Sequence, residues 1–199
     1  MKRLQALFLA LFVPWSLTGF TTPGVAPCAR AGEIVPPSRQ AVIVLRALAY
    51  DANLKRRAGD TINIAVMYKK GYSGSERMAG MMTKAFGALE ATRVSGLPIL
   101  VTRLPFTGVE ALKKSINGGG IDVLYVCEGM EGELPAISAI SRQMKVLTVG
   151  SREEHITKGL SLGVFVMDDK CAILLNLPAS KREGVSFAAD LLRLARVIR

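Results

Sequence analysis

His155 is the residue of this 199-residue sequence best suited to acid–base or metal chemistry, because it is the only histidine in the chain. Glu153 and Glu154 precede it in a segment with the pattern of a helix start, so a metal or general-base role could be built there. A zinc-type site needs further ligands at usable spacing, and no second ligand follows. We therefore predict that His155 is a solvent-exposed helix residue and that the chain binds no metal.

Two other groups could take part in catalysis. Cys127 follows an apolar strand pattern, where nucleophiles sometimes lie, but His155 is the only base that could activate it. Asp168 and Asp169 are adjacent between two expected strands, where such residues form a turn rather than face a shared substrate gap. No serine lies in a Gly-x-Ser-x-Gly motif. The sequence therefore predicts a protein that is not an enzyme, with no catalytic residues and no cofactor.

The loop Lys69-Lys70-Gly71-Tyr72-Ser73-Gly74-Ser75 is the best candidate for a ligand site. It joins an apolar strand to a helix at the carboxyl end of the expected sheet, where open α/β folds bind ligands. Helix-start N–H groups together with the two lysines could hold an anion, and the residues concerned are Lys69, Lys70, Gly71 and Ser73. The loop matches neither the dinucleotide-binding glycine motif nor the Walker A motif. An ordinary strand-to-helix connection is the alternative.

Strand and helix patterns alternate along the chain and indicate the fold class. Strands are expected at 62–68, 97–104, 121–127, 145–149, 162–167 and 171–177. Helices are expected at 38–57, 73–89, 107–117 and 134–144, followed by one that begins at Ser151 and a closing amphipathic helix at 185–199; Ser73, Thr107 and Ser151 each begin a capping-box pattern. Strands rich in Val, Ile and Leu that alternate with helices predict a mostly parallel sheet covered on both faces. We predict one three-layer α/β domain with a C-terminal strand hairpin and a closing helix.

The first 31 residues have the pattern of an export signal. Lys2 and Arg3 precede an apolar run over 6–13, which is far shorter than the roughly 20 residues of a membrane span. Small residues at 29 and 31 place the cleavage site near Ala31. Residues 32–37 are then a linker and 38–199 the α/β domain, which would not itself span a membrane after signal cleavage.

Charge and cysteine content limit the function further. The net charge is +10, but the basic residues are scattered and are not interleaved with aromatic residues, so nucleic-acid binding is not expected. They form either a solvated face or a surface that attracts an acidic partner or anionic lipid. Cleavage near Ala31 would remove Cys28 and leave Cys127 and Cys171. These two could form a disulfide in an oxidising compartment, or each could be an ordinary buried residue.

Several segments resemble the YfiR family of periplasmic regulators. Leu-Thr-Val-Gly at 147–150, Leu-Leu-Asn-Leu-Pro-Ala-Ser at 174–180 and the segment 186–198 are similar to that family's C-terminal part, and Ile-Asp-Val-Leu-Tyr-Val-Cys at 121–127 resembles its central strand. The likeness extends from about Ala41 to Arg199. The segment 44–55 has a single aromatic residue and lacks the Trp-Pro pair usual in the family's first helix, which marks a divergent member.

The resemblance implies a periplasmic, non-enzymatic protein that restrains an inner-membrane sensor protein such as a diguanylate cyclase. The alternative is a periplasmic small-ligand or anion-binding sensor module. A regulator needs an exposed apolar patch rimmed by polar residues, whereas a ligand-binding module needs a concave pocket with convergent polar groups. A homodimer is compatible with either function.

Overall fold

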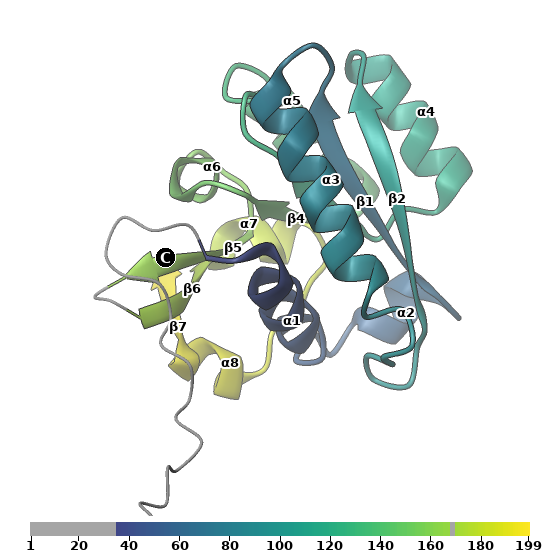
Figure 1. The fold of residues 1–199 in the computed structure, drawn as a ribbon. Helices are drawn as coiled ribbons and strands as arrows, with labels where there is room; N and C mark the ends of the chain where they lie inside the picture. The colour runs from purple at the N-terminus through teal and green to yellow at the C-terminus, as the bar shows by residue number, and fades with distance from the viewer. Residues whose placement is uncertain (1–34, 168–169) are drawn as a thin grey trace, which may run out of the picture.

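The computed structural model describes residues 35–167 and 170–199, and a seven-stranded sheet runs through them (Figure 1). The strands are β1 (Ile62–Lys69), β2 (Ile99–Phe106), β3 (Val123–Val126), β4 (Leu147–Gly150), β5 (Leu162–Met167), β6 (Lys170–Asn176) and β7 (Ala195–Ile198). The helices are α1 (Pro37–Leu48), α2 (Leu54–Ala58), α3 (Ser73–Gly87), α4 (Val109–Gly119), α5 (Leu134–Met144), α6 (Glu153–Thr157), α7 (Leu177–Arg182) and α8 (Ala189–Leu194).

The strand order is β2-β1-β3-β4-β5-β6-β7. Every neighbouring pair is parallel except β5 and β6, which form an antiparallel hairpin. Parallel neighbours need crossover connections, and helices supply them because strands buried on both faces must be covered on both sides. The predicted fold class, an α/β domain with a mostly parallel sheet and a C-terminal hairpin, is therefore confirmed.

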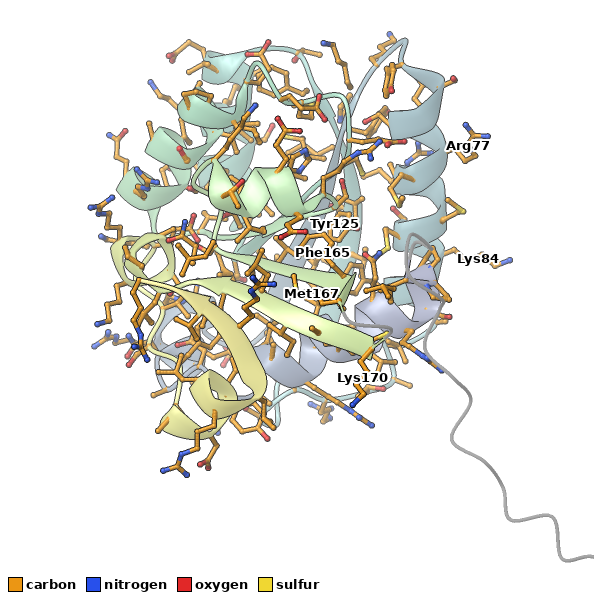
Figure 2. All side chains as sticks on the ribbon, turned by 90° about the vertical axis from the view of Figure 1, so that its left-hand side faces the viewer. Arg77, Lys84, Tyr125, Phe165, Met167 and Lys170 are labelled. Atoms are coloured by element: carbon orange, nitrogen blue, oxygen red, sulfur yellow. The ribbon has the colours of Figure 1, made fainter. Side chains whose placement is uncertain are left out.

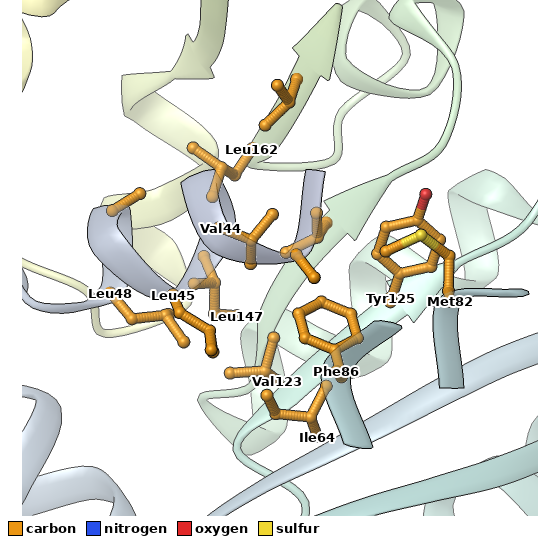
Figure 3. Close-up of a cluster of buried hydrophobic side chains, with 14 of the residues drawn as sticks. Val44, Leu45, Leu48, Ile64, Met82, Phe86, Val123, Tyr125, Leu147 and Leu162 are labelled. Atoms are coloured by element: carbon orange, nitrogen blue, oxygen red, sulfur yellow. The ribbon is translucent and has the colours of Figure 1, made fainter. Parts of the chain in front are cut away.

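Alternating strand residues divide the core into two layers, one on each face of the sheet. Val123 and Tyr125 of β3 pack in the cluster that includes α1 and α3, whereas Leu124 and Val126 pack in the cluster that includes α4 and α5. In the first layer the rings of Phe86 and Tyr125 meet edge to face, with centroids 6.1 Å apart (Figure 3).

Helix α3 illustrates how amphipathic spacing orients a helix on the sheet. Arg77 and Lys84 project outward from it (Figure 2), whereas Met82 and Phe86 are buried in the core. Polar and apolar residues thus occupy opposite sides of one helix, as its sequence pattern requires.

The predicted first helix at 38–57 is wrong in one respect, because it is two helices. Helix α1 ends at Leu48 and α2 begins at Leu54. Between them the buried carboxylate of Asp51 accepts hydrogen bonds from the N–H groups of Asn53 and Ser186, both at 2.9 Å. An aspartate that bonds nearby backbone groups competes with helix formation, so the chain turns here.

The predicted closing helix at 185–199 is also corrected. Residues 185–188 lie alongside the α1–α2 connection, α8 is only six residues long, and the chain then enters β7. Val197 and Ile198 pair in parallel with β6, which suits their β-branched side chains. The apolar residues whose spacing suggested a single helix instead pack from three successive segments: residues 185–188, α8 and β7.

The helix starts also differ from the sequence patterns. The N-cap residues of α3, α4 and α6 are Tyr72, Gly108 and Arg152, and none of these three helix starts has a side-chain cap hydrogen bond. The three predicted capping boxes are therefore not formed. Helix α7 was not predicted; its cap is Asn176, whose side chain accepts from the N–H of Ala179.

Leu191 is the core anchor of α8, with 1% of its surface exposed, whereas Leu194 on the same helix is 69% exposed. We expect Leu191→Ala to lower the free energy of unfolding by about 2–5 kcal/mol, because it leaves a cavity beneath the helix. The matched control Leu194→Ala should change it by less than about 0.5 kcal/mol. Urea unfolding monitored by circular dichroism measures both values, and equal losses would show that α8 does not anchor the C-terminal segment.

Candidate functional site

A crevice is expected where β1 and β3 lie side by side. The chain leaves β1 for α3 on one face of the sheet and leaves β3 for α5 on the other face. Open α/β sheets bind ligands at such a switch point, outside the carboxyl ends of the strands. The loops that meet here are 70–72, after β1, and 127–133, after β3.

The predicted anion-binding residues are all exposed: Lys69 ends β1, Lys70 and Gly71 lie in the first of these loops, and Ser73 begins α3. Two of the loop's backbone donors are already used within the chain. The N–H of Lys69 donates to Ser75 Oγ at 3.0 Å, and the N–H of Gly71 donates to Glu76 Oε1 at 2.9 Å. The two lysines face solvent, so anion binding by this loop stays a prediction that rests mainly on them.

Glu128, in the second loop, is a candidate site residue that sequence reasoning missed. Its carboxylate lies against the start of α3, so closely that a methyl group at Gly74 would be 2.6 Å from Glu128 Oε1. Arg152 Nη2 pairs with Glu128 Oε2 at 2.6 Å. A carboxylate is favoured at a helix N-terminus, and an arginine fixes its orientation. The signal available in the sequence was a charged residue directly after the central strand.

A small cavity lies beside this ion pair. Its volume is about 210 Å³, and it is lined by Val35, Gln40, Met78, Glu128, Ser151, Arg152, Glu153, Val164, Phe165 and Val166. The hydroxyl of Ser151 is buried and has no hydrogen-bond partner among the described residues. Gln40 is engaged, since its side chain accepts from Tyr125 Oη at 2.8 Å and donates to the Val35 carbonyl at 3.0 Å. The cavity thus combines apolar walls with both signs of charge and a free hydroxyl.

His155 is not the solvent-exposed residue that the sequence predicts. It is 0% exposed, and its Nε2 lies 3.4 Å from Glu131 Oε1. Burial lowers the pKa of the imidazole, which favours the neutral ring. The cause is Gly150, because a methyl group there would lie 2.6 Å from His155 Cβ and would push α6 away. Among residues 35–167 and 170–199, no group of three or more His, Cys, Asp or Glu could hold a metal ion.

The sequence left open whether Cys127 and Cys171 pair with each other. Cys127 is free and fully buried, and Cys171 is disulfide-bonded, so a Cys127–Cys171 disulfide is not formed. The reason is distance: the two cysteines lie on β3 and β6, three strand spacings of about 4.8 Å apart, whereas a disulfide needs Cα atoms within about 7 Å. Asp168, Asp169 and the export signal fall outside the described residues, so the turn and the cleavage near Ala31 stay predictions.

Two apolar grooves run along α1. The first, here the α1–loop groove, has a volume of about 290 Å³ and is lined by Val42, Leu45, Arg46, Ala49, Leu89, Thr92, Arg93, Val94 and Ser95. The second, the α1–β6 groove, has a volume of about 610 Å³ and is lined by Ile43, Arg46, Ala47, Ala49, Tyr50, Cys171, Ile173, Leu191 and Leu194. Arg46 and Ala49 belong to both, so the outer side of α1 forms one continuous, largely apolar surface.

A model of the YfiR/HmsC-like family matches residues 39–196, which is most of the chain. The chain belongs to the YfiR/HmsC-like family. The resemblance found in the sequence is thereby confirmed, and the family is one of regulatory, non-catalytic proteins. A search of curated proteins found no match. In the part of this family member that the structure describes, no helix is both long and apolar enough to cross a membrane.

Solved structures share the fold at low sequence identity. An ABC domain from Streptococcus pneumonia in complex with L-Trp has a TM-score of 0.58 and 12% identity, over 82% of this chain and 62% of its own length. A conserved domain protein from Vibrio cholerae has a TM-score of 0.59 and 11% identity, over 82% and 60%. A ligand-free, open substrate-binding protein with adhesive properties from Clostridium difficile has a TM-score of 0.51 and 17% identity, over 74% and 57%. The chain therefore matches about three fifths of the length of these structures.

Burial raises the pKa of the Cys127 thiol to about 12, so we expect Cys127 to be unreactive in the native protein. At pH 8 the thiolate fraction would be about one in ten thousand. Iodoacetamide should label Cys127 only after denaturation, whereas an added cysteine at the exposed position Lys114→Cys should react in the native state. Mass spectrometry of the two alkylated proteins compares them. Rapid native labelling at Cys127 would contradict both its burial and its raised pKa.

Proposed function

We propose that this protein is a periplasmic, non-enzymatic regulator that binds the periplasmic sensor segment of an inner-membrane diguanylate cyclase. The observation that carries the proposal is the family match over residues 39–196. The side chains best suited to chemistry support it, because each is held in a structural role. Cys127 is buried with a raised pKa, and His155 is buried against Glu131.

The outer surface of α1 is suited to binding a protein partner. The α1–loop groove has an apolar floor that includes Val42 and Leu45, and the exposed side chains of Arg46 and Arg93 lie at its rim. An apolar centre with a charged rim is the usual anatomy of a protein interface. A partner segment with apolar side chains flanked by carboxylates would complement it.

Restraint of a membrane partner requires unequal binding to its two states. If the domain binds the inactive conformation of the cyclase 1–3 kcal/mol more tightly than the active one, cyclase output changes by about 5–150-fold. No chemistry on the partner is needed. The protein therefore acts through binding energy alone, which agrees with a site built from apolar surface and arginines.

Deletion of the gene should raise cyclic di-GMP and surface attachment, and restoring the exported chain should lower both. The double variant Arg46→Glu with Arg93→Glu should fail to restore them and should capture the membrane partner at least about tenfold less well, because like charges would face each other. Lys114→Glu with Lys181→Glu, which makes the same charge change on α4 and α7, is the matched control and should restore both. If deletion leaves cyclic di-GMP unchanged and the wild-type chain captures no membrane protein, the regulator proposal fails.

A second candidate function is a small-ligand or anion-binding sensor module. It is favoured by the fold shared with an ABC domain that was solved with L-Trp and with a substrate-binding protein, and by the cavity beside Glu128 and Arg152. A carboxylate, an arginine and a free serine hydroxyl could together hold a small zwitterion or anion. The loop with Lys69 and Lys70 offers a second place for an anion.

Calorimetry separates the two ligand sites. Phosphate, carboxylates, nucleotides and amino acids are titrated at millimolar concentration into the wild-type chain. If the cavity binds the ligand, Arg152→Ala should weaken binding at least about tenfold and Lys69→Ala with Lys70→Ala should not. If the loop binds an anion, the effects are reversed, with unchanged melting curves. The ligand-binding proposal is abandoned if the wild-type chain gives no heat with any of these compounds.

A further inference from the structure

His155, the only histidine of the chain, is buried in a way that suits its neutral form alone. None of its surface is exposed, and its Nδ1 atom is buried without a hydrogen-bond partner among the described residues. Its Nε2 lies 3.4 Å from Glu131 Oε1, which also accepts the N–H of Gly129 at 3.1 Å. An imidazolium carries an N–H on both ring nitrogens. A protonated ring would therefore be a buried charge with one donor left unsatisfied.

Helix α6 links this ring to the cavity beside Glu128 and Arg152. A methyl group at Gly150 would lie 2.6 Å from His155 Cβ, so α6 packs directly on the end of β4. Arg152 comes just before α6, and its guanidinium pairs with Glu128 at 2.6 Å. Movement of α6 away from the sheet would therefore separate this ion pair. It would also uncover the buried hydroxyl of Ser151, which lines the cavity.

The charged groups that face the ring come from one loop and from α6 itself. Glu131 of the loop 127–133 lies nearest, and Glu154 on α6, which also pairs with Lys158, is a second carboxylate. Both favour the protonated ring, whereas Arg152 opposes it. Burial outweighs the two carboxylates and lowers the pKa of the imidazole.

The strands packed against α6 add no charge beside the ring. Neither β4 nor β5 contains a titratable residue. The charged residue of β6, Lys170, lies at the opposite end of that strand from Asn176, whose amide donates to the Ile156 carbonyl at 3.1 Å. Behind α6, Arg142 donates to the carbonyl of Gly159 at 3.2 Å. The state of the ring is therefore set by its burial and by the groups of the preceding paragraph.

We propose that His155 is a pH-sensitive switch: the uncharged ring holds α6 on the sheet at neutral pH, and protonation in acid releases α6 and opens the cavity beside Glu128 and Arg152. In the open state both ring nitrogens reach water, which solvates the charge. Opening takes up one proton. The ratio of open to closed protein therefore rises by at most about tenfold for each pH unit below 6.5, the ordinary pKa of histidine.

The direction of this pH effect distinguishes His155 from the buried carboxyl groups. A ring whose pKa is lowered in the closed state stabilises that state above pH 6.5, and the stabilisation is lost as the pH falls. Burial raises the pKa of Glu183 and of Asp122, so their protonation in acid favours the folded state instead. Partial burial raises the pKa of Glu131, but hydrogen bonds, among them those from Gly129 and His155, outweigh it and lower the pKa below 4.5. Glu131 thus stays charged while His155 titrates.

Thiol accessibility at position 151 tests the switch. Ser151→Cys places a thiol where the buried hydroxyl lines the cavity, and Lys114→Cys, at an exposed position of α4, is the matched control. Both variants are treated with dithiodipyridine across the range from about pH 5 to about pH 8, and mass spectrometry follows labelling at each position. We expect the rate at 151 divided by the rate at 114 to be constant above about pH 7.5 and to rise about five- to tenfold per pH unit below about pH 6.5. A ratio that does not depend on pH overturns the proposal.

Two further substitutions, each combined with the thiol probes, assign the effect to the ring. His155→Gln keeps an amide near Glu131 but takes up no proton, so the rate ratio should no longer depend on pH. Glu131→Gln removes the carboxylate that favours the protonated ring, so opening should begin at a lower pH. If His155→Gln does not fold, the comparison of Glu131→Gln with the parent decides. An unchanged pH dependence in folded His155→Gln, or no shift in Glu131→Gln, contradicts the switch.

Hydrogen exchange distinguishes release of α6 from acid unfolding of the whole domain. The N–H groups of Lys158 and Leu160 donate to the carbonyls of Glu154 and His155, at 2.9 and 3.0 Å. In the wild type their protection should fall with pH as the thiol ratio rises, while the amide of Met82 in α3 keeps its protection. Equal loss at all three amides would show global unfolding and would overturn the proposal.

Neither result depends on the proposed regulatory function. Labelling and exchange use the isolated protein, whereas the regulator proposal is tested through cyclic di-GMP and partner capture. Release of α6 in acid by a protein without effect on cyclic di-GMP would leave the switch standing. A pH-independent α6 in a protein that restrains a cyclase would overturn the switch alone.

Discussion

The buried carboxylate of Glu183 is the interaction on which the C-terminal half of the sheet depends. It accepts hydrogen bonds from Ser141 Oγ at 2.9 Å and from the N–H and hydroxyl of Thr148 at 2.9 and 2.7 Å, and the hydroxyl of Ser161 donates a further one. One side chain after α7 thus joins α5, β4 and the start of β5. Burial raises its pKa, so the four donors must offset a large desolvation cost, and removing the carboxylate would leave buried donors such as the Thr148 N–H unsatisfied.

A second network lies at the amino ends of β3 and β4. Arg57 pairs with buried Asp51 at 3.0 Å and donates to the carbonyls of Asp122 and Lys145, at 3.3 and 3.1 Å. These carbonyls come directly before β3 and just before β4. Arg57 also lines a cavity of about 540 Å³, but its donors are already engaged. The structural polar groups therefore lie mainly at the amino ends of the strands, and Glu128, Arg152 and the lysines of the β1–α3 loop remain at the carboxyl ends.

The sequence predicts the parts of the fold that depend on local pattern. Apolar strands and their order along the chain determine the α/β class, and Gly120 ends α4 in the left-handed conformation that only glycine adopts without strain. The wrong predictions are those that depend on distant partners. His155 is buried because Gly150 lets α6 approach, and Glu128 meets the start of α3 because two loops 54 residues apart converge on one crevice. The spacing of apolar residues within a short stretch of sequence does not indicate such long-range contacts.

The β5–β6 hairpin gives the sheet its only pairing between strands adjacent in sequence without a crossover. Every other strand pair can form only after an intervening helix or loop has folded back. Some contacts span still more of the chain: the hydrogen bond from Ser186 N–H to Asp51 joins residues 135 apart. Loop-closure entropy must be overcome before these contacts contribute, so such a topology folds slowly and passes through states with unpaired strands. Until its last segment packs against its first helix, a chain of this kind is exposed to proteolysis and to aggregation with other chains. The amount of folded protein in the cell therefore depends on the folding time as well as on the final stability.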